Sequence, residues 1–190
     1  AMDKQWWITC DKLYDKTNHL FFRDSKYMTQ KTANGKNVYW SRGNGWVVAG
    51  TCNVLAYMPA DYPTRPRYEQ LLKEMTEKLA SIQQPSGLWT MSLADPEANP
   101  NAETSGTSFF CYAMTWGVNN KLLDRAKFEP VIDKAWTAMN AHILPNGLIG
   151  AVQPVGEAPI TTNYDKTSQP YAVGAYLLAG CEIIKMHGDK

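Results

Sequence analysis

The 190-residue chain contains 44% hydrophobic and 19% charged residues and carries a formal net charge of +1. This length and composition predict a single folded domain with a sizeable core and exclude a disordered chain. The balanced charge gives no basic surface for nucleic acid, and the sequence shows neither a run of about eighteen apolar residues nor a signal-peptide pattern. We therefore expect a soluble protein with neither nucleic acid nor a membrane as a partner, in a compartment that the sequence leaves open.

Cysteines and histidines are widely spaced along the chain, and this spacing argues against both a disulfide framework and a metal site. We expect the cysteines to be small core residues, and we expect no metal and no cofactor. The residues concerned are Cys10, Cys52, Cys111 and Cys181 together with His19, His142 and His187.

Helical patterns of two kinds alternate along the sequence. A helical pattern surrounds Trp6 and Trp7, and apolar residues recur at three- and four-residue steps over 68–82 and 128–143. Such steps predict amphipathic helices with one buried face. Other stretches are apolar or small on nearly all sides, which is typical of helices enclosed by other helices. These enclosed stretches are 46–57, 107–118 and 171–184.

Each enclosed stretch follows a similar linking segment, which itself follows an amphipathic helix. The leucines of the three links, Leu20, Leu88 and Leu148, are separated by 68 and 60 residues. That separation is the length of a helix, a loop and a second helix. We therefore predict an all-α fold of about six helices in three hairpins, each with an inner and an outer member.

Inner and outer rings of helices are the organisation of an (α/α) toroid, although a short α-solenoid or a plain bundle would show the same periodicity. The segment 21–39 contains a polar turn at Asn34-Gly35 between apolar flanks. This pattern predicts a small β-hairpin over one end of the helices.

One short motif combines an arginine, two glycines and two tryptophans. Arginine offers a planar fork of donors that matches a carboxylate, and tryptophan offers a broad apolar face for a pyranose ring. The two glycines would let the chain turn sharply or approach a ligand closely. The motif therefore predicts a sugar-acid pocket. The alternative is a Gly-rich turn entering a helix, with the arginine salt-bridged and both indoles buried. The motif reads Trp40-Ser41-Arg42-Gly43-Asn44-Gly45-Trp46.

Together with Gly87-Leu88-Trp89 and the block 103–107, this motif resembles the C-terminal half of the unsaturated glycuronyl hydrolases, glycoside hydrolase family 105 and its relative family 88. The resemblance implies that residues 1–190 form the C-terminal portion, about half, of an (α/α)6-barrel domain. It also implies a substrate, namely an oligosaccharide ending in the 4,5-unsaturated uronic acid that a polysaccharide lyase leaves on pectin-like polymers. In these families an aspartic acid protonates the vinyl ether carbon, water adds at the neighbouring carbon, and the hemiketal opens to release the sugar.

The resemblance also implies roles for particular residues. Arg42 and Trp46 match the substrate-binding arginine and tryptophan of the families, and further contacts are expected from residues near them in the fold. These expected contacts are Trp40, Asn44, Arg23, Thr104 and Ser105. Tyr27, Tyr39 and Trp89 could line the cleft, and core packing explains each of them equally well.

The general acid of the families lies in an Asp-Asp-Leu-Phe-Met type segment, and the 190 residues contain no such segment. We therefore expect this chain alone to be inactive as a hydrolase. Asp24 is a weak candidate for a substitute acid, and a solvated loop carboxylate paired with Arg23 is the favoured alternative. Thr104 or Ser105 is expected as the N-cap of an inner helix, leaving free backbone donors toward the cavity, with simple capping as the alternative.

Two other kinds of function stay open from the sequence: a non-catalytic carbohydrate-binding or assembly module, and a helical scaffold with no sugar site. In each case a half-barrel would expose apolar faces of its inner helices, so we expect a homo-oligomer. Candidate contact residues are Val47, Phe109 and Tyr176.

Overall fold

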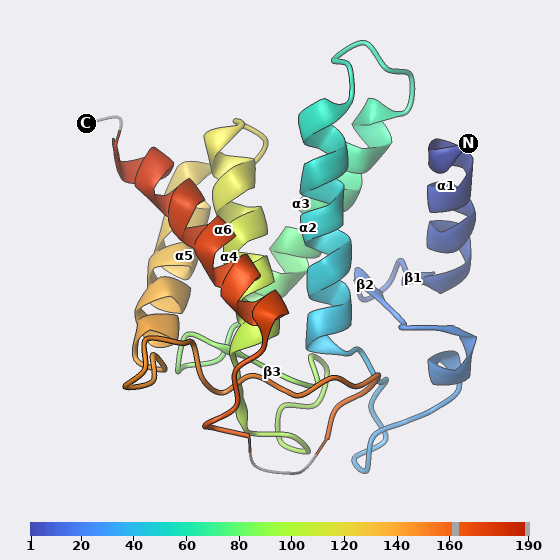
Figure 1. Ribbon diagram of the computed structural model, residues 1–190. Coiled ribbons are helices and arrows are strands. Elements are labelled where there is room, and N and C mark those ends of the chain that lie inside the picture. Colours follow the sequence, from blue (N-terminus) through green and yellow to red (C-terminus); the bar gives the residue numbers. More distant parts are fainter. Residues whose placement is uncertain (161–163, 189–190) are drawn as a thin grey trace.

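The computed structural model describes residues 1–160 and 164–188, and helices dominate this part of the chain (Figure 1). The helices are α1 (Met2–Leu13), α2 (Ser41–Tyr57), α3 (Arg65–Ser81), α4 (Thr104–Asn119), α5 (Arg125–Asn140) and α6 (Pro170–Gly188), with a 3-10 helix η1 (Ser25–Met28). The short strands are β1 (Tyr14–Asp15), β2 (Leu20–Phe21), β3 (Trp89–Thr90) and β4 (Ala102–Glu103). The predicted all-α class is confirmed.

The strands form two small antiparallel pairs. Strand β1 pairs with β2, and β3 pairs with β4 so that Trp89 lies opposite Glu103. Of the hairpin predicted over 21–39, only the tip forms. Gly35 has a φ of 73°, and one bridge joins Lys31 to Asn37. Phe21 pairs with Tyr14 instead, because η1 separates the two predicted arms.

Helices α2, α4 and α6 form an inner layer, and α1, α3 and α5 form an outer layer. Helix α4 lies between α2 and α6, with α5 packed beside it, and 15 of its 16 residues are buried. Its sequence, TSGTSFFCYAMTWGVN, has apolar or small side chains on every face, as an enclosed helix requires. Helix α3 buries a single stripe of apolar residues: Tyr68, Leu71, Leu72, Met75 and Leu79.

The inner and outer helices alternate as predicted, and the toroidal fold class is confirmed, but the hairpin pairing differs from the prediction. Short loops join each inner helix to the outer helix that follows it, giving the hairpins α2–α3 and α4–α5. Helix α1 is therefore an outer helix without an inner partner before it, and α6 is an inner helix without an outer partner after it among the described residues. The described chain holds two complete hairpins and two unpaired helices, not three hairpins.

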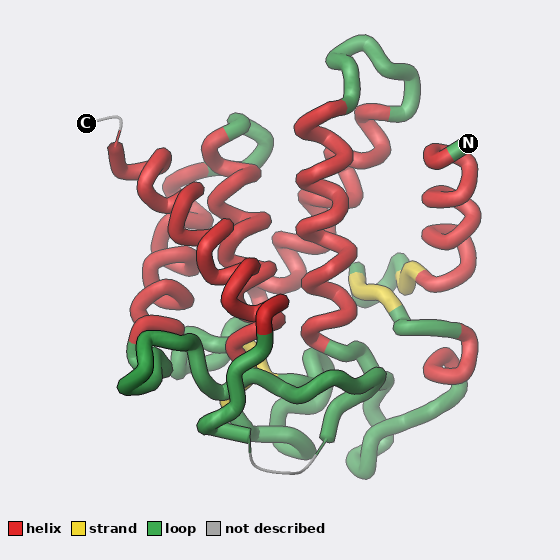
Figure 2. Tube along the Cα trace, in the orientation of Figure 1, coloured by secondary structure: helices red, strands yellow, loops and turns green. Residues whose placement is uncertain are grey.

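The long segments between outer and inner helices gather at one end of the molecule, where α2, α4 and α6 begin (Figure 2). Glycine makes two of these turns possible. Gly87 and Gly147 have φ values of 93° and 82°, and a Cβ at Gly87 would lie 2.5 Å from the main-chain oxygen of Lys134. Both glycines therefore permit turns in a conformation that L side chains rarely adopt.

No helix in the described residues combines the length and hydropathy that a bilayer crossing requires.

Candidate sugar-binding site

The arginine–tryptophan motif forms the first two turns of α2, because the helix begins at Ser41 and Trp40 occupies its N-cap position. Gly43 and Gly45 are therefore helical, and the sharp turn that they would permit does not form. A Cβ at Gly45 would lie 2.9 Å from Cβ of Phe109, and one at Gly43 would lie 3.0 Å from the ring of Trp40. These glycines permit close packing against α4 and against the indole of Trp40.

Arg42 is buried, with 3% of its surface exposed, and its guanidinium is held by main-chain oxygens of a distant loop. Nη1 donates to the carbonyl of Gln153 at 2.6 Å, and Nη2 donates to that of Pro154 at 2.9 Å. The guanidinium carbon lies 4.7 Å from the ring centre of Trp40 and 4.6 Å from that of Tyr171. Burial lowers the pKa of Arg42, with the nearby carboxylate of Glu103 opposing that effect.

Among the described residues no carboxylate forms an ion pair with Arg42, so the salt bridge of the alternative interpretation is not formed there. The fork of donors instead fixes the loop 153–154 over the start of α2. Arginine suits this task because its donors lie in one plane and keep their charge.

Gln153 and Tyr171 complete this cluster, and the sequence interpretation missed both. Nε1 of Trp40 donates to Oε1 of Gln153 at 2.7 Å, and the hydroxyl of Tyr171 donates to the main-chain oxygen of Gln153 at 2.6 Å. Gln153 is fully buried. The available signal was a glutamine in the otherwise apolar stretch 149–155, since a buried amide needs hydrogen-bond partners.

Trp46 differs from the rest of the motif because about half of its surface, 51%, is exposed. It lies one turn after Arg42 on the same face of α2, and its ring centre is 4.3 Å from that of Phe109 on α4. All seven tryptophans belong to the described residues, and Trp46 is the one with a large exposed surface. A half-exposed indole supported from behind by a second ring is suited to stacking against a sugar.

Asn44 is almost fully buried and ties β2 to α2. Its Oδ1 accepts from the main-chain N–H of Phe21 at 2.7 Å, and its Nδ2 donates to the carbonyl of Phe21 at 3.0 Å and to that of Trp40 at 3.1 Å. These contacts use both ends of the amide in the scaffold, and a contact between Asn44 and a sugar stays a prediction.

The N-cap predicted for α4 is wrong, because Glu103 and not Thr104 or Ser105 occupies that position. Oε1 of Glu103 accepts from the main-chain N–H of Ser105, and Oε2 accepts from that of Gly106 at 2.7 Å. Thr104 donates its hydroxyl proton to the carbonyl of Gly150 at 2.7 Å. The backbone donors expected to face the cavity are therefore already bound by a buried carboxylate.

Arg23 and Asp24 form an ion pair in the loop before η1. Burial raises the pKa of Asp24, but hydrogen bonds from Arg23 and from the N–H of Lys26, with the positive charges of both residues, together outweigh it and lower the pKa below its usual value. A carboxyl group that donates a proton needs the opposite shift. The geometry therefore supports the ion-paired loop carboxylate over the substitute acid.

A mostly apolar cavity of about 450 Å³ lies between α1 and α2. Arg23, Trp40 and Asn44 contribute to its lining, so the structure brings three of the predicted residues to one cavity. Arg42, Trp46, Thr104 and Ser105 lie outside that lining. The remaining candidates for the cleft, Tyr27, Tyr39 and Trp89, are buried in the core with at most 4% exposure.

The cysteines divide into two groups. Cys10, Cys52 and Cys111 are buried as predicted, and burial raises the pKa of Cys10 to about 11 and that of Cys111 to about 12. Cys181 is exposed on α6, so its predicted core position is wrong. The apolar pattern around Cys181 suggested a helix enclosed on all sides, but among the described residues nothing covers the face of α6 that carries Cys181, Leu177 and Ile184.

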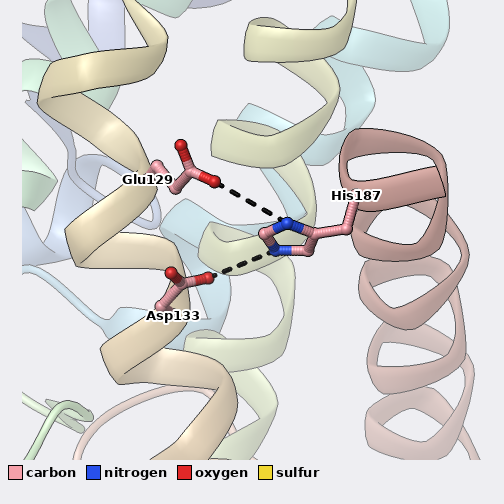
Figure 3. A group of neighbouring side chains, drawn as sticks. All are labelled: Glu129, Asp133 and His187. Atoms are coloured by element: carbon pink, nitrogen blue, oxygen red, sulfur yellow. Dashed lines mark ion pairs between the residues drawn. The ribbon is translucent and has the colours of Figure 1, made fainter. Parts of the chain in front are cut away.

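Three ligand-type side chains meet on the outside of the molecule, although the sequence predicted scattered histidines and no metal (Figure 3). Nδ1 of His187 lies 3.7 Å from Glu129, and Nε2 lies 3.6 Å from Asp133. Potential ligand atoms of these residues lie within 4.8 Å of one another, but Arg125 already donates to both carboxylate oxygens of Glu129. The group links α5 to the end of α6 and contributes nothing to the Arg42 cluster.

Inner and outer helices in alternation are the architecture of the helical-toroid glycoside hydrolases to which this structure is similar. The family model described as Glycosyl Hydrolase Family 88 matches residues 1–187, and the chain belongs to this family.

Curated relatives include unsaturated 3S-rhamnoglycuronyl hydrolases from Formosa agariphila and Alteromonas sp. (strain LOR). The first is 41% identical over 191 residues, a match that covers 97% of this chain and 50% of the relative. The second is 37% identical over 182 residues, covering 96% and 44% respectively. A solved glycosyl hydrolase family 88 structure from Bacteroides vulgatus superimposes with a TM-score of 0.92 at 39% identity, covering 96% of this chain and 54% of that one. The chain spans about half the length of the curated relatives it matches.

Proposed function

We propose that residues 1–190 form the C-terminal portion of an (α/α)6-barrel domain and bind the 4,5-unsaturated uronic acid at the end of a lyase-generated oligosaccharide. The relatives are named as hydrolases of unsaturated glycuronyl compounds, which supports this substrate class. The observation that carries the proposal is the half-exposed Trp46, one helical turn from Arg42 at the start of an inner helix.

In this proposal Trp46 stacks on the pyranose ring, since its indole offers a flat apolar face supported by Phe109. Arg42 holds the uronate carboxylate through the donors that the carbonyls of Gln153 and Pro154 leave free, or by exchanging one of those carbonyls for the ligand. A guanidinium has five N–H groups, and a carboxylate is a stronger acceptor than a main-chain carbonyl. In the second case the loop 153–154 would move on binding.

The reaction proposed for the complete domain is hydration of the 4,5-double bond. A carboxylic acid protonates the vinyl ether carbon, water adds to the adjacent carbon that carries the ring oxygen, and the resulting hemiketal opens. In this proposal the 190-residue chain supplies binding groups, while Asp24 stays paired with Arg23 and Glu103 caps α4, so that neither acts as the acid. We propose that this chain alone binds the uronide without turning it over.

The test is calorimetric titration with an unsaturated disaccharide and with its saturated counterpart, alongside an assay for loss of the double-bond absorbance. We expect selective binding of the unsaturated sugar and no turnover. Trp46→Ala should weaken binding about tenfold, a loss of ~1.4 kcal/mol. The matched control is Tyr57→Ala on the same helix, where the ring is 91% exposed.

Equal affinity for the two sugars, or an unchanged affinity in Trp46→Ala, would refute this site. Turnover at ordinary enzymatic rates would instead show that the chain contains its own acid. The alternative function is a non-catalytic carbohydrate-binding module. It would be supported if the chain binds the sugar without turnover even when it is combined with the remaining half of a family domain. The proposal also includes a second copy of the chain as a partner.

A further inference from the structure

Three groups of the Arg42 cluster are hydrogen-bonded to one buried residue, Gln153. Its main-chain oxygen accepts from Nη1 of Arg42 and from the hydroxyl of Tyr171, each at 2.6 Å, and its Oε1 accepts from Nε1 of Trp40 at 2.7 Å. The rings of Trp40 and Tyr171 are the two rings on which the guanidinium packs. Arg42 and Tyr171 lie in the first turns of the inner helices α2 and α6, so Gln153 also joins these helices (Figure 1).

The side-chain amide of Gln153 has one orientation that satisfies its partners. The indole N–H of Trp40 can only donate, and the carbonyl of Ala158 can only accept, so Oε1 faces the indole and Nε2 donates to that carbonyl at 2.7 Å. The second bond closes the loop 153–158, which contains Pro154, the other main-chain partner of Arg42. An apolar side chain at position 153 would therefore release both the indole and this loop.

Arg42 carries a buried positive charge, and within the described part of the chain no carboxylate forms an ion pair with it. Glu103 is also fully buried, but its carboxylate accepts from the N–H groups at the start of α4 and, at 3.4 Å, from the N–H of Gln153. Gln153 is thus hydrogen-bonded to both charges, to one through its N–H and to the other through its carbonyl. A buried charge is costly without an opposite charge beside it, so the guanidinium is suited to receive the carboxylate of a ligand.

We infer that Gln153 is a positioning residue for the uronate carboxylate and that it acts through Arg42. By fixing the guanidinium together with Trp40 and Tyr171, it presets the direction of the N–H groups that remain for the ligand, which lowers the cost of ordering them on binding. Its contact with Glu103 keeps that carboxylate from taking the place of the ligand. This role rests on the proposed function, because it requires that Arg42 binds a uronate.

The test compares calorimetric affinities for an unsaturated uronide and for its methyl ester, which lacks the negative charge. Gln153→Met keeps the length of the side chain and removes its hydrogen bonds. It should weaken binding of the free acid about tenfold, the effect of one lost hydrogen bond to a charged group, and change binding of the ester by less than about twofold. A residue that only stabilises the fold would lower both affinities alike, or only the melting temperature.

The matched control is Gln83→Met. Nε2 of Gln83 donates to the carbonyls of Gly87 and Val131, each at 2.9 Å, so this amide also ties a loop to a helix. Gln83→Met should lower the melting temperature and leave the ratio of the two affinities unchanged. Tyr171→Phe is a milder second variant, because it keeps the ring on Arg42 and removes only the hydroxyl. It should lower the ratio by a smaller factor than Gln153→Met does.

The outcomes separate this role from the proposed function. A parent chain that binds acid and ester equally refutes the uronate contact of Arg42 and, with it, the role of Gln153. If the parent prefers the acid and Arg42→Lys abolishes that preference, a folded Gln153→Met variant that keeps it overturns only the role of Gln153. If Gln153→Met does not fold, an unchanged preference in Tyr171→Phe has the same meaning.

A double variant tests whether Gln153 acts through Arg42. Arg42→Lys combined with Gln153→Met should bind the acid as weakly as Arg42→Lys alone, because residues that act as one unit are not additive. A further loss as large as that of Gln153→Met in the parent chain would show that the two residues act independently, and would overturn the inference.

Discussion

Helices α4 and α1 belong to the same alternating pattern but have very different surroundings. In α4, 15 of 16 residues are buried, whereas in the 12-residue α1 only Cys10 is buried. Helix α1 is held by a few polar and aromatic contacts with α3, among them the rings of Trp6 and Trp7 against Tyr68. The comparison shows that the number of neighbours around a helix, and not its composition alone, decides how much the helix contributes to the free energy of unfolding.

A sharp way to break this comparison is to delete one apolar side chain from each helix. Phe110 is fully buried in α4 and meets Trp89 edge-on, so Phe110→Ala should lower the free energy of unfolding by about 3–5 kcal/mol. Ile8 is 50% exposed on α1, and Ile8→Ala should change the free energy of unfolding by less than about 0.5 kcal/mol. Urea unfolding followed by circular dichroism measures both. Equal losses would mean that α1 is as well packed as α4.

The start of α4 provides a test of close packing between inner helices. A Cβ at Gly106 would lie 2.1 Å from Oγ of Ser41 and 3.1 Å from its main-chain carbon, so Gly106→Ala should cost about 3 kcal/mol. Gly50 on α2 is the control, because its Cβ would meet only Trp6, at 3.8 Å. Gly50→Ala should raise stability by up to about 1 kcal/mol through helix propensity. Thermal unfolding of the two variants should therefore shift in opposite directions.

Much of the fold could be predicted from the sequence because helix periodicity and burial pattern are local properties. The enclosed character of 107–118 follows from residues within a few positions. Hairpin pairing could not be predicted in the same way. The repeated sequence pattern lies in the segments that lead from an outer helix to the next inner helix. The loops within the hairpins α2–α3 and α4–α5 are short and share no motif.

The candidate site was less accessible to prediction because its contacts join distant segments. Arg42 binds carbonyls 111 and 112 residues away, and no local pattern announces such a partner. The glycines of the motif suggested a loop, since glycine lowers helix propensity, but tertiary packing against Phe109 outweighs that preference. Glu103 was missed as an N-cap because Ser, Thr, Asp and Asn are the usual capping residues.

The same substitution, arginine to lysine, can be made at Arg42 in the inner helix α2 and at Arg67 in the outer helix α3. Arg42→Lys should weaken binding of an unsaturated uronide by about 1.5–3 kcal/mol, because the fork is lost while the charge is kept. Arg67 stacks on Trp7 at 3.9 Å, between α3 and α1, and Arg67→Lys should leave that affinity unchanged. Calorimetry measures both affinities. If Arg42→Lys lowers only the melting temperature, Arg42 acts as part of the scaffold and does not contact the ligand.

The smallest expected effect is a loss of stability at low pH that affects α1 and not α4. The hydroxyl of Thr64 donates to Oδ1 of Asp3 at 2.6 Å, and Tyr68 and Trp7 donate to the same oxygen. The bond from Thr64 is the main cause of a lowered pKa of Asp3 in the folded chain. A lowered folded pKa stabilises α1 above the unfolded value of about 3.9 and ceases to do so as the pH falls through the folded value.

On acidification from neutral pH to below about 4, amide protection should therefore fall in α1 while α4 stays protected, as hydrogen exchange would measure. Asp3→Asn should weaken α1 protection already at neutral pH and leave less to lose on acidification. Asp11→Asn, on the same helix but exposed, should behave as the parent chain does. If α1 and α4 lose protection together in every variant, the two helices unfold as one cooperative unit and the edge is not separately held.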